Sequence, residues 1–434
     1  MTIEHLHAVP HLTTALTGPL QRLEEHLLSH QGDIEQWLRD QWQETRAPFY
    51  ASVDLRNAGF KLAPIDTNLF PAGFNNLNPA FMPLCVQAVQ SAMEHYGPKA
   101  RNILLVPESH TRNLFYLESL AALKKILETA GFQVRIGSLI VDLKEAQTIV
   151  LPSGASIVLE PLVRESNRLR VGDFAPCFVL LNNDMSGGRP AILENLSQTV
   201  VPPLAMGWSN RLKSSHFTHY RRVAGEFARL IAIDPWLIDP IFRNCGQIDF
   251  QQRIGEECLV TNVAAVLDQI TQKYREYGID QQPFVIVKAD AGTYGMNIMT
   301  VHSTDQLREL NRKQRTKMAR GKEGHLVTDV IVQEGVYTFE TWGEPQATAE
   351  PVVYMIDRFV VGGFYRVHPG RGRDENLNMP GMSFEALAFE DSCTQPDRTR
   401  APDAQPNRFY AYGVIARLAL LAAAREIHEA SLGG

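Results

Sequence analysis

Residues 284–295, FVIVKADAGTYG, are the stretch of this sequence that decides its fold. A β-branched strand ends in a lysine, a turn with two glycines follows, and an apolar strand returns over Ile298–Val301. Glycines let a loop fold closely over phosphate groups and offer backbone N–H donors, while a strand lysine adds a compact cation. The stretch therefore predicts a phosphate-binding loop around Lys288, Gly292 and Gly295. An ordinary hairpin with a surface lysine explains this stretch equally well.

Three further segments follow the loop in a fixed order. Residues 330–336 form an apolar run that ends in polar residues and a glycine, which suits an adenine slot. The next strands place an arginine at a strand end, where its guanidinium can grip a carboxylate or phosphate with two prongs. A polar, glycine-containing loop comes last. Singly, these are also explained by an edge strand, a surface arginine and a solvated turn, but their order favours a nucleotide site. The residues that this interpretation selects are Gln333, Glu334, Val336, Arg366 and Asn376.

Composition excludes several classes of protein. The 434 residues are 44% hydrophobic and 21% charged, as in an ordinary globular protein. The net charge of −6 gives the chain no overall electrostatic attraction to nucleic acid or to an anionic membrane. Neither GxxxxGK[ST], GxGxxG nor GxSxG occurs. The apolar run Tyr410–Ala424 is interrupted by Arg417 and is too short to span a bilayer. We expect no secretory signal, because the first twenty residues lack a Lys-rich start followed by an apolar core. Five scattered cysteines without a CxxC pair indicate a reducing cytosol. We expect a cytoplasmic protein with mostly buried, structural thiols.

Hydrophobic periodicity predicts an α/β protein of two or three domains. Paired strands are expected at Phe49–Leu55 and Phe60–Ile65, after N-terminal helices. A strand–helix–strand unit begins at Asn102–Val106, and another strand at Phe178–Leu181 predicts a parallel α/β domain over residues 101–205. The other expected elements are a connector at Asp391–Asn407 and helices at Tyr220–Ile233, Val263–Tyr277 and about Tyr412–Ala430. The basic tract Asn311–Lys322 is expected to be a solvated helix or the edge of the loop that covers the nucleotide, and not a nucleic-acid contact.

The order of the nucleotide elements resembles the ATP-grasp superfamily, which usually places a carboxylate–x–Asn metal motif after them. Here a matching motif, Asp66-Thr67-Asn68, lies near the beginning of the chain. This placement resembles the circularly permuted ATP-grasp fold of eukaryotic-type glutathione synthetases, with an inserted parallel α/β substrate domain; Asp66 stands where they have Glu. The residues implied by the resemblance are Asp66, Asn68 and Asp290 as Mg²⁺ ligands, Lys213 and Lys288 for phosphates, and Arg56 and Arg366 for the substrate carboxylate or the transferring phosphoryl group.

Longer segments are similar to a bacterial glutamate–cysteine ligase family. They are PIDTNLFPAGFNN (64–76), PESHTRN (107–113), VKADAGTYGM (287–296) and FYRVHPGR (364–371). The resemblance implies ATP and Mg²⁺ as cofactors, and glutamate and cysteine as substrates of the first step of glutathione biosynthesis, through γ-glutamyl phosphate. The implied parts are residues 1–100 (helices and the metal-binding strand segment), 101–205 (the α/β substrate domain) and 206–434 (the nucleotide-binding region).

Two strand ends are candidates for amino-acid recognition. Arg112 lies where a strand meets a helix N-terminus, which suits an anion, although helix capping explains the segment equally well. Asn182 and Asp184 follow the next strand, and Asp184 could take an ammonium group; a turn-forming role is the better alternative. A glutathione synthetase or another ATP-grasp ligase, a phosphotransferase and a non-catalytic nucleotide-binding protein remain alternatives, and a homo-oligomer is possible.

Overall fold

A computed structural model of the chain describes residues 19–109, 113–292, 298–319, 328–343, 346–386 and 408–432. The helices within these ranges are α1 (Pro19–Ser29), α2 (Gln31–Glu44), α3 (Met82–Tyr96), α4 (Leu114–Thr129), α5 (Lys213–Leu230), α6 (Glu256–Tyr277), α7 (Thr304–Arg308), α8 (Arg312–Ala319) and α9 (Arg408–Leu432). The strands of the first half are β1 (Tyr50–Asn57), β2 (Leu62–Asn68), β3 (Asn102–Pro107), β4 (Gln133–Ser138), β5 (Gln147–Val150), β6 (Ser156–Pro161), β7 (Val163–Glu165), β8 (Arg168–Arg170), β9 (Phe178–Asn182) and β10 (Thr199–Val201). Those of the second half are β11 (Phe242–Gln247), β12 (Val285–Ala289), β13 (Ile298–Val301), β14 (Asp329–Glu334), β15 (Thr341–Trp342), β16 (Ala347–Ile356), β17 (Phe359–His368) and β18 (Ser383–Ala386).

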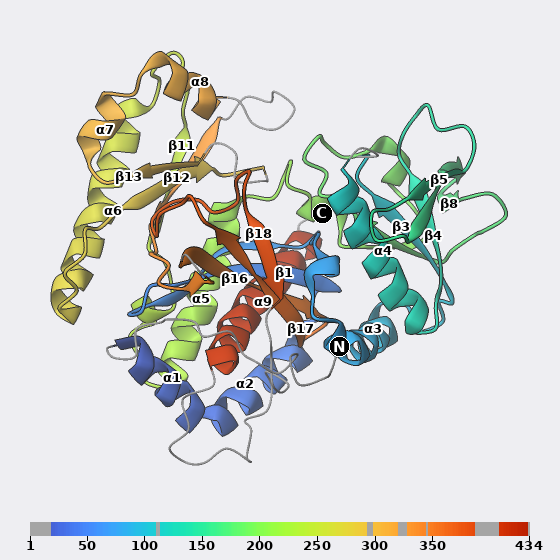
Figure 1. Ribbon diagram of the computed structural model, residues 1–434, viewed down its shortest axis with the longest axis horizontal. Coiled ribbons are helices and arrows are strands. Elements are labelled where there is room, and N and C mark those ends of the chain that lie inside the picture. The colour runs from blue at the N-terminus through green and yellow to red at the C-terminus, as the bar shows by residue number, and fades with distance from the viewer. Residues whose placement is uncertain are drawn as a thin grey trace.

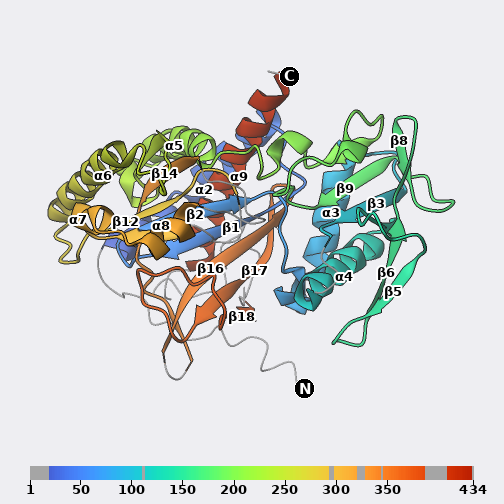
Figure 2. The same ribbon diagram turned by 90° about the horizontal axis from the view of Figure 1, so that it is seen from above.

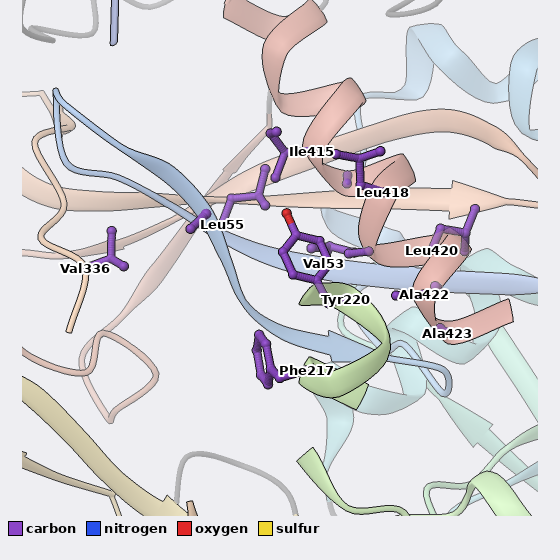
Figure 3. Close-up of a cluster of buried hydrophobic side chains, with 14 of the residues drawn as sticks. Val53, Leu55, Phe217, Tyr220, Val336, Ile415, Leu418, Leu420, Ala422 and Ala423 are labelled. Carbon is purple, nitrogen blue, oxygen red and sulfur yellow. The ribbon is translucent and has the colours of Figure 1, made fainter. Parts of the chain in front are cut away.

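The central sheet joins the two ends of the chain. Its strand order is β18-β17-β16-β1-β2, so strands from the start of the sequence pair with strands from near its end (Figure 1). Alternation along these strands places apolar side chains such as Val53 and Leu55 on one face, against α5 and α9 (Figure 3). From Tyr410 to Ala424 every residue of α9 except Gly413 is a core residue with under 5% exposure, apart from a buried Arg417. A helix that is apolar nearly all round belongs inside a protein.

A second sheet forms the α/β part of the chain. Its order is β10-β9-β3-β4-β6-β5, with all neighbours parallel except β5 and β6. Helices α3 and α4 lie beside this sheet, which stands to one side of the central sheet (Figure 2). The predicted strand–helix–strand unit is confirmed, because β3, α4 and β4 follow one another and β3 and β4 pair in parallel.

A third, antiparallel sheet of order β11-β14-β12-β13 carries the stretch with which the sequence analysis began. Lys288 pairs with Ile298 of the returning strand β13, as predicted. Helix α6 packs on the face that holds Val285 and Val287, which leaves Ile286, Lys288 and Gln333 on the other face.

The expected mixed α/β architecture is present, and the differences are local. Helices α5 and α6 begin about two turns before their predicted starts at Tyr220 and Val263. The first two turns of α5 are mostly polar, whereas those of α6 contain the buried Leu259 and Val260, which continue its apolar face and which the prediction missed. No helix in the described ranges is both long and apolar enough to cross a membrane. The expected connector at 391–407 lies outside the described residues.

Candidate active site

Two buried lysines converge on Asp66 from different elements. The Nζ atom of Lys288, on β12, donates to the carbonyl of Ile65 at 2.8 Å, which brings the third sheet against β2. Lys213 begins α5, and its Nζ atom donates to the carbonyl of Gly292 at 2.5 Å. The two lysines are only 8% and 7% exposed (Lys213 and Lys288). Three residues chosen from distant parts of the sequence therefore lie in one place.

The charges in this cluster shift one another's protonation. Burial lowers the pKa of Lys288 to about 8, against the attraction of Asp66, and the neighbouring Lys213 lowers it further. The pKa of Lys213 is also lowered, chiefly by burial. Burial alone would raise the pKa of Asp66, but Lys213, Lys288 and Arg211 together hold it below its ordinary value. The site therefore holds cationic groups that lack full solvation, which is favourable for an anionic ligand.

Asp54 is a site residue that the sequence analysis did not select. It lies directly opposite Asp66 in the antiparallel pairing of β1 and β2, so the two carboxylates share one face of the sheet. Burial raises the pKa of Asp54, Arg366 lowers it, and Glu350 and Asp66 raise it. The sequence could have predicted this residue, because Asp54 lies two positions before the selected Arg56 and alternate residues of a strand share one face.

Arg366 completes an alternating row of charges across the central sheet. Its Nη1 atom donates to Asp54 Oδ2 at 2.9 Å and to Glu350 Oε1 at 2.5 Å. Its Nε atom is buried and has no hydrogen-bond partner within the described residues. An unused donor on a guanidinium that already faces carboxylates is available to an additional acceptor.

Each of the three guanidinium nitrogens of Arg56 donates to the protein itself. Its Nε donates to Glu350 Oε2 at 3.0 Å, Nη1 to the carbonyl of Val336 at 3.1 Å, and Nη2 to the carbonyl of Glu375 at 2.5 Å. These bonds join β1 to two segments that border Lys288's face of the third sheet. The geometry supports a positioning role for Arg56 more directly than the predicted grip on a substrate.

Asp290 caps a helix. Its two carboxylate oxygens accept from Ser214 N at 2.7 Å and Ser214 Oγ at 2.6 Å, and its own carbonyl accepts from Lys213 N. The residue is completely buried. A carboxylate at a helix N-terminus satisfies donors that have no partner within the helix. Both oxygens of the predicted metal ligand are thus committed to α5, which explains why α5 starts at Lys213.

In the predicted adenine hinge, the side chain of Glu334 is bonded within the core, whereas the side-chain amide of Gln333 has a nitrogen without a partner among the described residues. Glu334 receives bonds from Lys61 Nζ at 2.8 Å, Ile241 N at 2.8 Å and Trp236 Nε1 at 3.0 Å, so its carboxylate is satisfied within the core. Gln333 lies on the same sheet face as Lys288, is 2% exposed, and its Nε2 has no partner in the described part of the chain. The backbone of Val336 is held by Arg56.

The carboxyl ends of the parallel strands line a cavity of about 640 Å³. Asp184 borders it, and Glu108, Ser138 and Lys144 contribute from neighbouring strand ends and loops. Crevices at this edge of an open α/β sheet are common ligand sites. Asn182 lies deeper: it is 2% exposed, and its Nδ2 donates to the carbonyl of Pro71 at 2.8 Å.

Backbone contacts connect this cavity to the lysine cluster. The carbonyl of Asp184 accepts from Trp208 N at 2.8 Å, and the carbonyl of Trp208 accepts from Gly292 N at 3.1 Å. The Nζ atom of Lys213 lies 4.3 Å from the centre of the Trp208 ring. Trp208, which the sequence analysis did not select, therefore links the two regions.

The remaining predicted site residues occupy varied positions. The Oδ1 atom of Asn68 accepts from Phe70 N at 2.9 Å, and Asn376 Oδ1 accepts from Asn378 N at 3.0 Å. Both side chains therefore shape local turns. Arg112 and Gly295 lie outside the described residues.

The donor set fits a magnesium ion that shares its ligands with phosphates. Across the described ranges, no three His, Cys, Asp or Glu side chains gather closely enough to hold a metal by themselves. Asp54 and Asp66 offer two opposed carboxylates. Mg²⁺ in proteins is usually held by one or two carboxylates, with phosphate oxygens and water completing an octahedron. The carboxylates of Asp54 and Asp66, beside two lysines that suit phosphate, match this coordination.

Buried lysines beside opposed carboxylates, next to an α/β domain with a cavity at its strand ends, are features of an ATP-dependent ligase. The chain belongs to the glutamate–cysteine ligase family, whose GshA description it matches over residues 24–427. A crystal structure from Methylobacillus flagellatus KT, provisionally assigned as a gamma-glutamylcysteine synthetase, is 61% identical, with a TM-score of 0.90 over 97% of this chain and 99% of that one.

A second solved structure is only weakly similar to the chain. A D-alanyl-alanine synthetase A from Vibrio cholerae O1 biovar eltor str. N16961 is 11% identical, with a TM-score of 0.33 over 73% of this chain and 80% of that one. A TM-score this low supports no conclusion about the fold. No curated protein matches the chain. Family membership makes the chain an ATP-dependent ligase enzyme, as the sequence analysis expected.

Proposed function

We propose that this ligase joins the γ-carboxylate of glutamate to the amine of cysteine at the Asp54–Asp66–Lys213–Lys288 cluster, through γ-glutamyl phosphate. The carboxylate attacks the terminal phosphorus of ATP and ADP leaves; the cysteine amine then attacks the acyl carbon and phosphate leaves. The observation that carries this assignment is the convergence of two buried lysines on Asp66. Phosphoryl transfer needs mainly positioning and charge neutralisation, which such a cluster supplies.

We assign phosphate binding to Lys213 and Lys288. Both are buried and held near Asp66 by hydrogen bonds to backbone carbonyls of Gly292 and Ile65. A poorly solvated ammonium group interacts more strongly with a phosphate than a solvated one, because little water has to be displaced. Arg366 would offer its unused Nε to the substrate carboxylate or the transferring group.

We propose Asp54 and Asp66 as the carboxylate ligands of Mg²⁺, which supplies charge neutralisation of the phosphates when bound. Their direct opposition across β1 and β2 supports this choice. Asn68 lies two residues after Asp66 on the same strand face and would join them after releasing Phe70. Asp290 is not included, because Ser214 occupies both of its oxygens.

We propose that the adenine lies against the face of the third sheet that holds Lys288, where the Gln333 amide, which has no partner among the described residues, meets the ring. The peptide groups of Glu334 and Val336 border the same slot, while the Glu334 carboxylate stays in the core. A permuted ATP-grasp core would then consist of residues 1–100 and 206–434, with residues 101–205 as the inserted substrate domain. The pairing of β1 with β16 supports this division, because it unites the two ends of the sequence in one sheet.

We assign the cavity at the parallel strand ends to an amino-acid substrate. Glu108 and Asp184 provide carboxylates for an ammonium group, and Lys144 provides an ammonium for a carboxylate. The exposed Lys144 can be changed without disturbing the core. We expect Lys144→Glu to raise the KM for glutamate or cysteine at least about fivefold and to leave the KM for ATP unchanged. Lys125→Glu, an exposed change outside the cavity, is the matched control; equal KM values in both variants would contradict the assignment.

The reaction is tested by measuring ADP release with glutamate plus cysteine against γ-glutamylcysteine plus glycine. The proposal expects ADP and γ-glutamylcysteine in equal amounts with the first pair and only background release with the second. Preference for the second pair would identify a glutathione synthetase instead. ADP formed with a stable phosphorylated acceptor and no amide would identify a phosphotransferase.

A further inference from the structure

Two thiols lie together away from the lysine cluster, where β11 meets the first turn of α6. The Sγ atoms of Cys245 and Cys258 are 3.7 Å apart. Cys245 is buried and Cys258 is exposed. Since an S–S bond is about 2.05 Å long, the sulfurs would need to approach by only about 1.7 Å to form one. We propose that Cys245 and Cys258 are an oxidisable dithiol, which small zwitterionic disulfides convert to an intramolecular disulfide.

The surroundings favour reaction at Cys258 first. Asn262 follows one turn later on α6, and its Nδ2 atom lies 3.3 Å from Cys245 Sγ and 3.5 Å from Cys258 Sγ. An amide N–H beside a sulfur stabilises the thiolate, which is the reactive form. Burial raises the pKa of the Cys245 thiol to about 11, although the Asn262 bond opposes this. The exposed Cys258 is therefore the thiol that meets a disulfide from solution, and Cys245 is the thiol that resolves the adduct.

The backbone at Cys245 has room to adjust. Asn244 pairs with Ile331 and Gln247 with Asp329, so two residues of β11 face one residue of β14 in a β-bulge. Such residues are released from the regular hydrogen-bond ladder. On the other side, a Cβ added to Gly255 would lie 2.6 Å from the carbonyl of Gln247, so the start of α6 packs directly on the end of β11. The helix thus holds Cys258 beside a segment that the regular hydrogen-bond ladder does not fix.

A surface hollow gives access to Cys258. Its volume is about 480 Å³, and its lining consists of Arg253, Gly255, Glu256, Glu257, Cys258 and Arg308. Arg253 Nε pairs with Glu256 Oε2 at 3.0 Å, and the lining also includes the guanidinium of Arg308 and the carboxylate of Glu257. Charges of both signs next to a thiol suit a molecule that carries both carboxylate and ammonium groups. Cystine, the disulfide of an amino acid thiol, has this chemistry.

The exchange balances as two thiol–disulfide steps. The Cys258 thiolate attacks one sulfur of cystine, the cystine S–S bond breaks, and one cysteine thiolate leaves and takes up a proton. The Cys245 thiolate then attacks Cys258 Sγ in the mixed disulfide and displaces the second cysteine. The protein loses two electrons and two protons, and cystine gains both to become two cysteines. This modification goes beyond the proposed ligase reaction and does not rest on it.

The test uses the full chain, first reduced and then incubated with cystine. Mass spectrometry of the intact chain and of its peptides, digested without reductant, measures each product. We expect a peptide pair linked through Cys245 and Cys258 in most molecules, reversed by dithiothreitol. In Cys245→Ser we expect cysteine to stay attached to Cys258, because the resolving thiol is gone. Cys177→Ser, which removes an exposed thiol elsewhere, should behave as the parent chain does.

Three results would overturn the proposal, and each is measured on the parent chain, so none depends on whether a variant folds. One is a stable cysteine adduct on Cys258 without linkage to Cys245. Another is linkage of Cys258 to a different cysteine. The third is recovery of both residues as free thiols under conditions that oxidise Cys177.

Discussion

Asp54 and Asp66 face each other directly across the antiparallel strands β1 and β2, yet the protein shifts their pKa values in opposite directions. Burial and neighbouring carboxylates raise the pKa of Asp54, whereas Lys213, Lys288 and Arg211 outweigh burial and lower that of Asp66. Opposed carboxylates repel each other unless a cation lies between them. Under the proposed function, a Mg²⁺ ion bound between the two carboxylates would favour the ionised form of Asp54.

We expect Asp54→Asn to stabilise the ligand-free protein, because burial raises the pKa of Asp54 and a group with a raised pKa costs stability when it is ionised. The same change should abolish most of the thermal stabilisation that MgATP provides and lower kcat by about 100-fold or more. Thermal unfolding with and without MgATP measures the first two effects. Asp66→Asn is the comparison: it should destabilise the ligand-free protein, because it leaves the lysines without their carboxylate. A lower melting temperature for ligand-free Asp54→Asn would show that the assignment is wrong.

ATP affinity should fall as the pH rises above about 8, where Lys288 loses its proton. The sign follows from the lowered pKa of Lys288. Below pH 8 the buried lysine is charged and costs folding stability; between pH 8 and the ordinary pKa of lysine it is neutral in the folded protein, so the free energy of unfolding rises with pH. Over the same range the site loses the cation that binds phosphate. We expect the Kd for ATP to rise up to about tenfold per pH unit in this range. Isothermal titration measures it. In Lys288→Arg, which keeps its charge, the rise should disappear; the same rise in that variant would assign the titration to another group.

Lys61→Met should destabilise the fold by about 3–5 kcal/mol, because it leaves the Glu334 carboxylate buried without its cation. The two side chains are 0% and 1% exposed and their charged atoms are 2.8 Å apart. Urea unfolding measures the loss. Adding Glu334→Gln should restore part of the stability, since the unpaired charge is removed. The folded double variant should bind ATP normally, and a large loss of affinity would instead indicate that the Glu334 carboxylate contacts the nucleotide.

Two arginines on the central sheet should respond differently to replacement by lysine. Arg56→Lys leaves the carbonyls of Val336 and Glu375 without their guanidinium donors. The loss should cost about 1–3 kcal/mol at the buried Val336 carbonyl, and less at the part-buried Glu375 carbonyl, which water can reach. Arg366→Lys keeps a charge between Asp54 and Glu350 but loses the free Nε, so kcat should fall about 100-fold with a smaller loss of stability. Thermal unfolding and steady-state kinetics separate the two effects. Normal turnover in Arg366→Lys would exclude a direct role in catalysis.

The periodicity of hydrophobic residues predicted many of the helices and strands, because it reports which face of each element is buried. The β-branched run before Lys288 folds as β12 and the return over Ile298–Val301 folds as β13. In the predicted strand–helix–strand unit, α4 follows β3 along the chain and leads to its parallel partner β4. Boundaries were missed where a tertiary contact supplies the cap, as Asp290 does for Ser214 at the start of α5. That contact joins residues 76 positions apart, and no local pattern reports it.

The sequence by itself determined the chemistry that is available: a strand lysine before a glycine-rich turn, a carboxylate–x–Asn motif near the other end, and segments shared with one ligase family. Only the tertiary structure decided which side chains have chemistry left to offer. Glu334, Arg56 and Asp290 are satisfied by partners within the protein, while Lys213, Lys288 and Asp66 are gathered without neutralising one another fully. The reason is physical: residue type fixes the donors, acceptors and charge of a side chain, but its free capacity depends on neighbours that only the register of distant strands supplies.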